Sequence, residues 1–235
     1  MDIKVFESYS EMSRFAADVL IDRIDPEQRV NIGLATGKTP AGMYQYWVQK
    51  LNQECRLDNI HFYNIDEYCN VKGTEPGTCR KYLEDHFFQH VQVQRNQIHW
   101  LNDKNYSAFD EAIRKAGGFH TIILGVGENG HIAYNEPHTE FGSLTHQVTL
   151  TPESKRQHAE EFGGIERVPD HAVSIGIRTI MNARNIILMA SGINKAKIIK
   201  AGLRGKISER IPVSVLQLHP SLLVLLDKEA ASALD

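Results

Sequence analysis

Residues 30–53 read VNIGLATGKTPAGMYQYWVQKLNQ and join an apolar run to a longer stretch through a turn that contains Gly37 and Pro40. The run 30–36 is largely apolar, which is typical of a strand buried on both faces of a sheet. Residues 41–53 are predicted to form a helix, and Pro40 suits its first turn because that position needs no backbone N–H. This stretch therefore predicts a buried strand that leads directly into a helix.

The same alternation runs from end to end of the 235 residues. Further strands are predicted at 3–6, 60–66, 120–127, 172–177, 185–191 and 222–227, and further helices at 10–24, 77–91 and 194–203. Apolar strands interleaved with helices predict an α/β fold, with a mostly parallel sheet covered by helices on both faces. Ser10 is expected to cap the first helix. No linker or repeat divides the chain, so we expect a single domain, residues 1–235.

Residues 145–167 form the longest stretch without clear periodicity. Loops of this length in compact domains are often lids over active sites. Sheets of this kind bind their ligands beyond the carboxyl ends of the strands. We therefore expect functional groups directly after the strands, and an active-site lid at 145–167.

The composition is that of a globular protein, with 42% hydrophobic residues, 23% charged residues and a formal net charge of −3. These values exclude a disordered chain, and the lack of excess positive charge argues against a nucleic-acid partner. The longest apolar runs, such as 186–190 and 222–226, are far shorter than the ~20 residues of a membrane-spanning helix, so no membrane partner is expected. The N-terminus lacks the apolar core of a signal peptide, which predicts a cytoplasmic protein.

The three cysteines, Cys55, Cys69 and Cys79, cannot all pair with one another, and their spacing matches no zinc or redox motif. Reduced thiols of this kind are typical of cytoplasmic proteins. The sequence predicts no functional role for any of the three.

The first strand-end segment is GLATGKTP, residues 33–40, in which a strand meets the start of a helix. Backbone N–H groups at such a point, together with the side chains of Thr36, Lys38 and Thr39, suit an anion. A nucleotide-binding Walker A loop needs four residues between its first glycine and its Gly-Lys pair, whereas this loop has only three. A sugar-phosphate site is favoured, and a tight glycine turn that binds nothing is the alternative.

The second strand-end segment is NIDEYCN, residues 64–70. Asp66 and Glu67 point to opposite sides of an extended backbone, so at most one of them faces a site at the sheet edge. That carboxylate could act as a general base for proton abstraction next to a carbonyl. The alternative is a pair that merely caps the next turn.

The third segment, GVGENGHIAYNEPH at 125–138, contains G-x-G-x-x-G after a strand. In dinucleotide-binding proteins this motif opens a helix, but here Pro137 follows too soon, which argues against NAD. A metal site of His131, Glu136 and His138 would match none of the metallo-hydrolase motifs. The favoured interpretation is acid–base chemistry by His131, oriented by Glu136, since imidazole titrates near neutral pH.

Lys195 opens a predicted helix, where the helix dipole disfavours a positive charge. A bound anion would remove this penalty. Simple solvation of a surface lysine is the alternative.

Taken together, LATGKTP (34–40), NIDEY (64–68) and GVGENGHIAYNEP (125–137) resemble motifs of the glucosamine-6-phosphate deaminase/isomerase family and its galactosamine-6-phosphate relatives. The similarity extends to SGINKA (191–196) and VSVLQLHPSLLVLLD (213–227), so it covers nearly the whole chain. The resemblance implies a Rossmann-like fold, no metal and no organic cofactor. It also implies a reaction in which a hexosamine 6-phosphate opens its ring, the aldose becomes a ketose and ammonia leaves.

The resemblance further implies roles for the residues that match the family motifs. The substrate and its phosphate would be bound by Thr36, Gly37, Lys38, Thr39, Gly127 and Lys195. Asp66 would move a proton between C2 and C1 through an enolamine. His131 would assist ring opening, with Glu136 tuning it, under the lid at 145–167.

Three departures from the family pattern bear on this site. Asn129 stands where these enzymes usually have Asp, so the acidic relay around His131 lacks one charge. The lid usually supplies an Arg to the phosphate, for which Arg156 or His158 would substitute here. Lys38 replaces a small residue and would add a phosphate contact.

Asn129 and PGTC (76–79) look more like the galactosamine-6-phosphate relatives, so the C4 configuration of the substrate stays open. The chain ends at Asp235, without the extension of the allosteric hexameric members, so we expect no such regulation and a monomer or small homo-oligomer. The alternatives are a 6-phosphogluconolactonase, which needs no proton shuttle, and a non-catalytic sugar-phosphate sensor. The Asn-Glu-Pro sequence at 135–137 favours the deaminases.

Overall fold

The computed structural model describes residues 1–54 and 57–234, so Cys55 lies outside the described residues. Its centre is a seven-stranded sheet in which neighbouring strands are parallel. In sheet order the strands are β1 (Asp2–Phe6), β10 (Leu222–Asp227), β9 (Asn185–Ala190), β6 (Thr121–Leu124), β2 (Val30–Leu34), β3 (Ile60–Asn64) and β5 (Ile98–His99). The predicted parallel α/β sheet is confirmed, and the short strand β5 is an addition to it.

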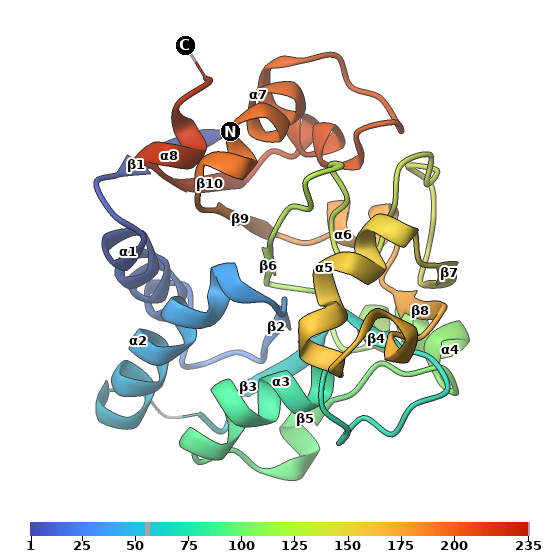
Figure 1. The fold of residues 1–235 in the computed structure, drawn as a ribbon. Helices are drawn as coiled ribbons and strands as arrows, with labels where there is room; N and C mark the ends of the chain where they lie inside the picture. The colour runs from blue at the N-terminus through green and yellow to red at the C-terminus, as the bar shows by residue number, and fades with distance from the viewer. Residues whose placement is uncertain (55–56, 235) are drawn as a thin grey trace.

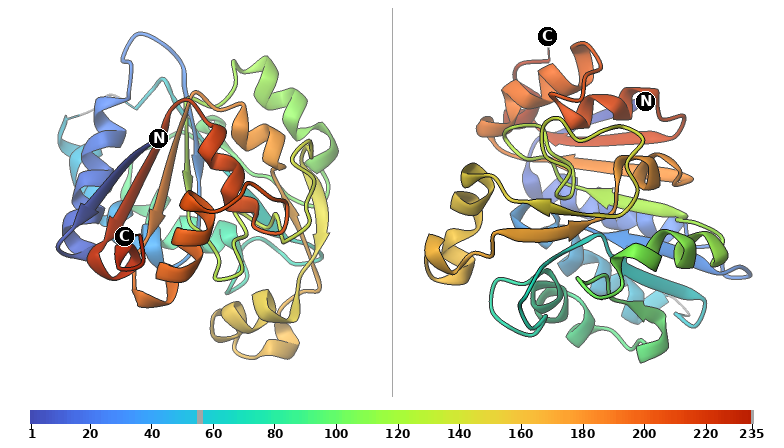
Figure 2. Two further views of the ribbon diagram at one scale, coloured as in Figure 1. Left: turned by 90° about the horizontal axis from the view of Figure 1, so that it is seen from above. Right: turned by 90° about the vertical axis from the view of Figure 1, so that its right-hand side faces the viewer.

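Helices cover both faces of this sheet (Figure 1 and Figure 2). The helices α1 (Tyr9–Asp22) and α2 (Lys38–Glu54) pack side by side on one face, and α4 (Tyr106–Lys115) and α6 (Ile177–Met181) lie on the other. The remaining helices are α3 (Cys79–His86), α5 (Pro152–Phe162), α7 (Ala196–Arg204) and α8 (Lys228–Ala231). In the described part of the chain, every helix is too short or too polar to span a bilayer.

Helices α1 and α4 differ from the sequence-based expectation, and α5, α6 and α8 also have no predicted counterpart. Ser8, not Ser10, caps α1, and its hydroxyl accepts the N–H of Glu11 at 3.2 Å. The spacing from Ser8 to Glu11 is that of a capping box, a signal the periodicity alone does not show. Helix α4 has no predicted counterpart, because its buried apolar residues are only Phe109 and Ile113.

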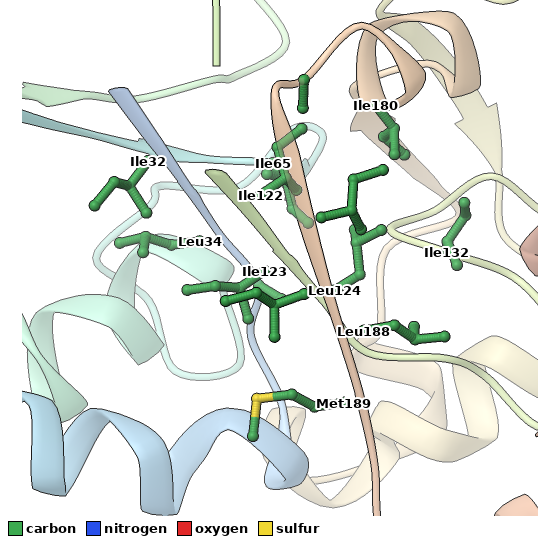
Figure 3. Close-up of a cluster of buried hydrophobic side chains, with 14 of the residues drawn as sticks. Ile32, Leu34, Ile65, Ile122, Ile123, Leu124, Ile132, Ile180, Leu188 and Met189 are labelled. Carbon is green, nitrogen blue, oxygen red and sulfur yellow. The ribbon is translucent and has the colours of Figure 1, made fainter. Parts of the chain in front are cut away.

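Apolar side chains of the central strands form the core between the two helix layers (Figure 3). Ile32 and Leu34 of β2 pack there with Ile123 of β6, and each of the three is at most 1% exposed. The cluster to which they belong draws on residues from Met12 to Ala230. The central strands therefore read as continuous apolar runs because both of their faces are covered.

A second, antiparallel sheet has three strands in the order β4 (Asp66–Tyr68), β8 (His171–Ser174) and β7 (His146–Thr149). The expectation that 172–177 joins the parallel sheet is therefore wrong, since His171–Ser174 pairs here. Ala172 and Val173 are fully buried, which explains their apolar character. An apolar run reports burial, but it does not report which sheet buries it.

The region 145–167 is more regular than its sequence predicts, since it holds β7, α5 and a 3₁₀ turn. Thr151 caps α5, Pro152 occupies its first turn, and Gly163 ends it with a left-handed φ of 73°. Within the described α5, Ser154 alone is buried, so the helix carries no apolar stripe that periodicity could reveal. In Figure 2, α5 projects away from the layers around the main sheet.

The buried side chain of Asn64 sets the point at which β3 ends. Its amide donates to the carbonyls of Asp66 (2.8 Å) and Leu101 (3.2 Å), and its oxygen accepts the N–H of Leu101 at 2.6 Å. After this residue the chain leaves the parallel sheet, and the carbonyl of Ile65 accepts the N–H of Ile175 at 2.9 Å. Asp66 therefore stands at the carboxyl edge of the parallel sheet, where the second sheet begins.

We expect Asn64→Ala to lower the free energy of unfolding by about 2–4 kcal/mol, because it leaves buried backbone groups of Asp66 and Leu101 without partners. The matched control is Asn52→Ala, which removes one exposed hydrogen bond to the carbonyl of His90. The control should cost less than about 1 kcal/mol. Urea denaturation followed by circular dichroism measures both, and equal losses would contradict the role given to Asn64.

Candidate active site

A pocket of about 400 Å³ opens at the carboxyl ends of β2, β6 and β9. Its walls come from the loops after these strands, from the start of β4 and from α5, here named the lid helix after the lid predicted at 145–167. Its lining includes Thr36, Gly37, Lys38, Thr39, Asp66, Gly127, His131, His158 and Lys195. The structure thus brings these sequence-predicted residues around one space, beside the point between β6 and β2 where the strand order reverses and where α/β sheets bind ligands.

Tyrosine hydroxyls hold the loop between β2 and α2. Tyr82 donates to the carbonyl of Gly37 at 2.7 Å, and Tyr9 donates to the carbonyls of Lys38 and Thr39 at 3.0 Å. Gly37 has a φ of 101°, a conformation that glycine adopts without strain. The N–H groups in the first turn of α2 have no intrahelical acceptor, so the loop presents donors suited to an anion.

Asp66 is buried in the wall of the pocket, with 6% of its surface exposed. Its Oδ1 atom bonds to no N–H or O–H group of the described chain. Burial raises the pKa of Asp66 from 3.8 to about 6, and the Cys79 thiol and the charge of His158 oppose this shift. The carboxylate therefore titrates close to neutral pH, as a general base should.

Glu67 points the other way, to the start of α3. Its carboxylate accepts the backbone N–H groups of Tyr68 (2.9 Å), Cys79 (3.0 Å) and Arg80 (2.9 Å). From the sequence, the Asp66–Glu67 pair could supply either a general base or a cap of the next turn. In the structure Asp66 lines the pocket, while Glu67 accepts N–H groups at the start of α3, whose N-cap residue is Thr78.

Gly127 makes room for the imidazole of His131. A Cβ atom at Gly127 would lie 2.2 Å from Cε1 of His131, so any larger residue would displace the ring. Burial lowers the pKa of His131, Glu136 opposes this effect, and the charges of His158 and Lys195 add to it. The ring is therefore neutral at neutral pH, and it can accept a proton.

Asn129 and Glu136 lie behind His131 and outside the pocket lining. Asn129 accepts the N–H of His131 at 3.1 Å and donates its amide to Glu136 Oε2 at 2.8 Å. The same Glu136 oxygen lies 3.7 Å from His131 Nδ1. The other oxygen accepts the hydroxyls of Thr151, at 3.5 Å, and of Ser154, both at the start of α5. Glu136 therefore links the imidazole to the lid helix.

Two lysines supply positive charge to the pocket. Lys195 is half-buried in the 3₁₀ turn before α7, and burial lowers its pKa while Glu128 opposes the shift. An ammonium at a helix start is unfavourable unless an anion is present. Lys38 is exposed and pairs with Glu160 of α5 at 3.6 Å, so it connects the β2–α2 loop to the lid.

The lid helix presents His158 to the pocket and turns Arg156 away. His158 Nδ1 lies 2.7 Å from Oε2 of Glu161, which also lines the pocket. Arg156 is exposed and outside the lining, because residues two apart on a helix point in nearly opposite directions. Of the two residues expected to replace a lid arginine, only His158 faces the site.

Sequence reasoning missed Gln157 and Glu161 in the pocket lining, together with the Ser154 contact to Glu136. The signal that could have found them is the Thr-Pro pair at 151–152. It starts a helix, and a helix places residues 154, 157, 158 and 161 on neighbouring positions of one face.

The metal site considered from the sequence includes His138, and this residue does not line the pocket. Its backbone N–H donates to the carbonyl of Glu209 at 2.6 Å. Across residues 1–54 and 57–234, no three His, Cys, Asp or Glu side chains are gathered as a metal ion would require.

Comparison with known proteins shows the family of the chain. Residues 7–224 match the family described as glucosamine-6-phosphate isomerases/6-phosphogluconolactonase. A glucosamine-6-phosphate deaminase of Thermoanaerobacter pseudethanolicus is 36% identical over 239 residues, which cover 99% of this chain and 94% of the relative. A glucosamine-6-phosphate deaminase of Alkaliphilus oremlandii is 39% identical over 242 residues, which cover 100% of both chains.

Solved structures extend the comparison to the fold. A monomeric glucosamine-6-phosphate deaminase superposes with a TM-score of 0.95 at 35% identity, covering 99% of this chain and 100% of that one. A 6-phosphogluconolactonase from Trypanosoma brucei superposes with a TM-score of 0.75 at 18% identity, covering 100% of this chain and 98% of that one, and shares the fold alone. The chain therefore belongs to the glucosamine-6-phosphate isomerase/6-phosphogluconolactonase family.

Proposed function

We propose that this protein is a hexosamine-6-phosphate deaminase-isomerase, which converts glucosamine 6-phosphate or galactosamine 6-phosphate into the ketohexose 6-phosphate and ammonia. The observation that carries the proposal is the buried carboxylate of Asp66, which shares a pocket with the imidazole of His131. Relatives named deaminases at 35–39% identity support it, whereas structures named 6-phosphogluconolactonases share 15–19%.

The substrate phosphate binds at the start of α2 in this proposal. The Thr36–Thr39 loop offers N–H and hydroxyl donors, and Lys38 and Lys195 provide charge. His158 approaches from the lid. A phosphate dianion next to Lys195 removes the electrostatic penalty of an ammonium at the start of α7.

His131 opens the sugar ring. Its neutral imidazole accepts the proton of the C1 hydroxyl and returns a proton to the ring oxygen, which yields the open-chain aldehyde. Glu136, 3.7 Å from Nδ1, stabilises the imidazolium that forms between the two transfers. Asn129 positions Glu136 through its amide but contributes no charge.

Asp66 then carries out the isomerisation. It removes the proton from C2, which produces an enolamine across C1 and C2, and it returns the proton to C1, while the C1 oxygen takes up the proton that the amino group loses as the imine forms. The product of this transfer is an imine at C2. Water adds to the imine and ammonia leaves, so the sum is hexosamine phosphate plus water giving ketohexose phosphate plus ammonia. A base with a pKa of about 6 is ionised at neutral pH and suits this role.

We further propose that residues 1–235 act as one domain with 145–167 as its lid, and that the protein works in the cytoplasm as a monomer or small homo-oligomer. One core cluster draws on both ends of the chain, which supports a single domain. The similar solved deaminase is monomeric. Cys69 and Cys79 are free thiols, as is usual in a reducing compartment.

We expect the purified protein to release ammonia from glucosamine 6-phosphate, galactosamine 6-phosphate or both, and to leave 6-phosphogluconolactone unhydrolysed. A coupled ammonia assay measures the first activity, and acid release in a pH-stat measures the second. The ratio of kcat/KM for the two hexosamines gives the preference at C4. Lactone hydrolysis without ammonia release would refute the proposed function.

We expect Asp66→Asn to lower kcat by roughly 10²–10⁴-fold while phosphate-ligand binding persists. The variant should also be more stable above pH 6. Because burial raises the pKa of Asp66 from 3.8 to about 6, ionised Asp66 destabilises the fold there by about 3 kcal/mol. That cost fades as the pH falls from 6 towards 4.

Ammonia release and urea unfolding at pH 8 and pH 4 test this prediction for Asp66. The stability gain should be present at pH 8 and absent at pH 4. If the variant turned over near the wild-type rate, Asp66 would not be the base, whatever the free energy of unfolding of the variant.

We expect Gly127→Ala to lower kcat by about 100-fold, because the new methyl group displaces the His131 ring and a shift near 1 Å is costly in catalysis. Gly125→Ala is the matched control in the same motif, since a Cβ atom there meets nothing within 4 Å. Steady-state ammonia release measures both. A Gly127→Ala enzyme as active as the control would show that His131 does not act from this position.

A further inference from the structure

Asp227 is a buried carboxylate at the carboxyl edge of the main sheet, and the proposed mechanism does not use it. It ends β10, it is 7% exposed, and it lies outside the lining of the pocket. The parallel register pairs Leu226 of β10 with Ala190, the last residue of β9. The residues that follow this pair are Asp227 and Ser191, and Ser191 does line the pocket. The strand register therefore places Asp227 directly behind one wall of the pocket.

The carboxylate of Asp227 holds the turn that follows β9. Its Oδ2 atom accepts the hydroxyl of Ser191, and both of its oxygens accept the N–H of Gly192 at 3.1 Å. The carbonyl of Gly192 in turn accepts the N–H of Lys195 at 3.0 Å. Two successive hydrogen bonds, through the backbone of one glycine, therefore connect Asp227 to the half-buried lysine of the pocket.

Hydrogen bonds fix this turn more than apolar packing does. Ile193 is the one large apolar residue of the 3₁₀ turn Ile193–Lys195, and 65% of its surface is exposed. On the pocket side, the amide of Asn194 donates to Oε1 of Glu128 at 2.7 Å. The turn is thus held from the front by Glu128 and from behind by Asp227.

Asp227 is also the N-cap residue of α8, but this role uses only one of its oxygens. Its Oδ1 atom accepts the N–H of Ala230 at 2.8 Å. Serine and asparagine cap helices about as well as aspartate does. Capping of α8 therefore does not explain why Oδ2 is bonded to Ser191 and Gly192.

The position of the Lys195 ammonium depends on its backbone being held. A lysine side chain is long and flexible, and it moves its charged end into water when it can. The start of α7 disfavours a positive charge, and burial disfavours it further. A fixed turn limits the escape of the ammonium to solvent in the free protein.

We propose that Asp227 is a positioning residue for phosphate binding, which fixes the turn from Ser191 to Lys195 so that the Lys195 ammonium faces the substrate phosphate. The inference rests on the proposed function, in which Lys195 binds that phosphate. It adds a residue outside the pocket, at the end of a strand that contributes no wall, to the groups that determine affinity.

The phosphate does not react, so Lys195 binds it equally in the ground state and in the transition state. Loss of such uniform binding raises KM and leaves kcat unchanged. We therefore expect Asp227→Ser, which keeps a capping oxygen for α8 but is too short to hold the turn as well, to raise KM for the hexosamine 6-phosphate by about tenfold. Its kcat should stay within about twofold of the wild type.

Asp227→Asn keeps an Oδ1 acceptor for both Gly192 and Ala230, so its KM should return most of the way to the wild-type value. Ser191→Ala removes the hydroxyl bond to Asp227 and leaves the α8 cap intact. The same split between KM and kcat is expected of it, so it carries the test if Asp227→Ser does not fold.

Asn59→Ala is the matched control, because it removes two side-chain hydrogen bonds just before β3, at the opposite edge of the sheet. Its amide donates to the carbonyls of Asp25 and Gln28, both at 2.6 Å. The control should lower the free energy of unfolding and leave KM within about twofold of the wild type. An Asp227→Ser enzyme whose KM changes no more than that of the control would overturn the proposal.

A double-mutant cycle on phosphate binding separates this inference from the proposed function. Calorimetric titration with inorganic phosphate needs no turnover. Lys195→Ala should raise the Kd for phosphate by about tenfold or more. Adding Asp227→Ser to Lys195→Ala should then change Kd by less than about twofold, because the ammonium that Asp227 positions is already gone.

The outcome of this cycle decides between the two claims. If the losses of the single variants multiply in the double variant, Asp227 does not act through Lys195, and the inference is overturned even in an active enzyme. If they do not multiply, but the wild type releases no ammonia, the proposed function is refuted and the positioning role of Asp227 stands.

Discussion

The hydrogen bonds of the buried Asn64 side chain are the constraint on which the site depends. They end β3 and turn the chain into β4, so that Asp66 and Glu67 project to opposite sides of a short strand between two sheets. Glu67 then bonds to the start of α3, and α3 carries Tyr82, whose hydroxyl holds the carbonyl of Gly37. One polar side chain at a strand end thus orders Asp66, α3 and the loop between β2 and α2, although these lie far apart in the sequence.

The opposite wall of the pocket is organised around Glu136. Its Oε2 atom lies near the His131 imidazole and accepts the amide of Asn129. Its Oε1 atom accepts hydroxyl groups at the start of α5. The start of the lid helix is therefore attached to the group behind the imidazole. Its far end meets the β2–α2 loop through the exposed pair of Lys38 and Glu160. Exposed ion pairs contribute only about 0–1 kcal/mol to stability, so Lys38 can leave Glu160 and bind a phosphate with little loss of free energy.

Two charged side chains of the pocket lower the stability of the free protein. Asp66 is ionised in a buried position, and Lys195 carries its charge at the start of a helix. Neither arrangement is favourable in the free protein, and both become useful when a phosphorylated substrate that must lose a proton from carbon is bound. The formal net charge of −3 gives no overall attraction for such an anion, so in the proposed mechanism binding depends on these local cations and on N–H groups.

The sequence by itself determined the parallel α/β sheet and the strand ends at which Asp66 and His131 stand, because burial on both faces leaves continuous apolar runs that periodicity detects. It placed 172–177 in the wrong sheet and missed the lid helix, whose described part has Ser154 as its one buried residue. Only the tertiary structure decided that His158 and not Arg156 faces the pocket, and that Glu67 turns away from the pocket to the start of α3. These outcomes depend on which distant elements meet, whereas a local pattern records that a side chain is buried without recording its partner.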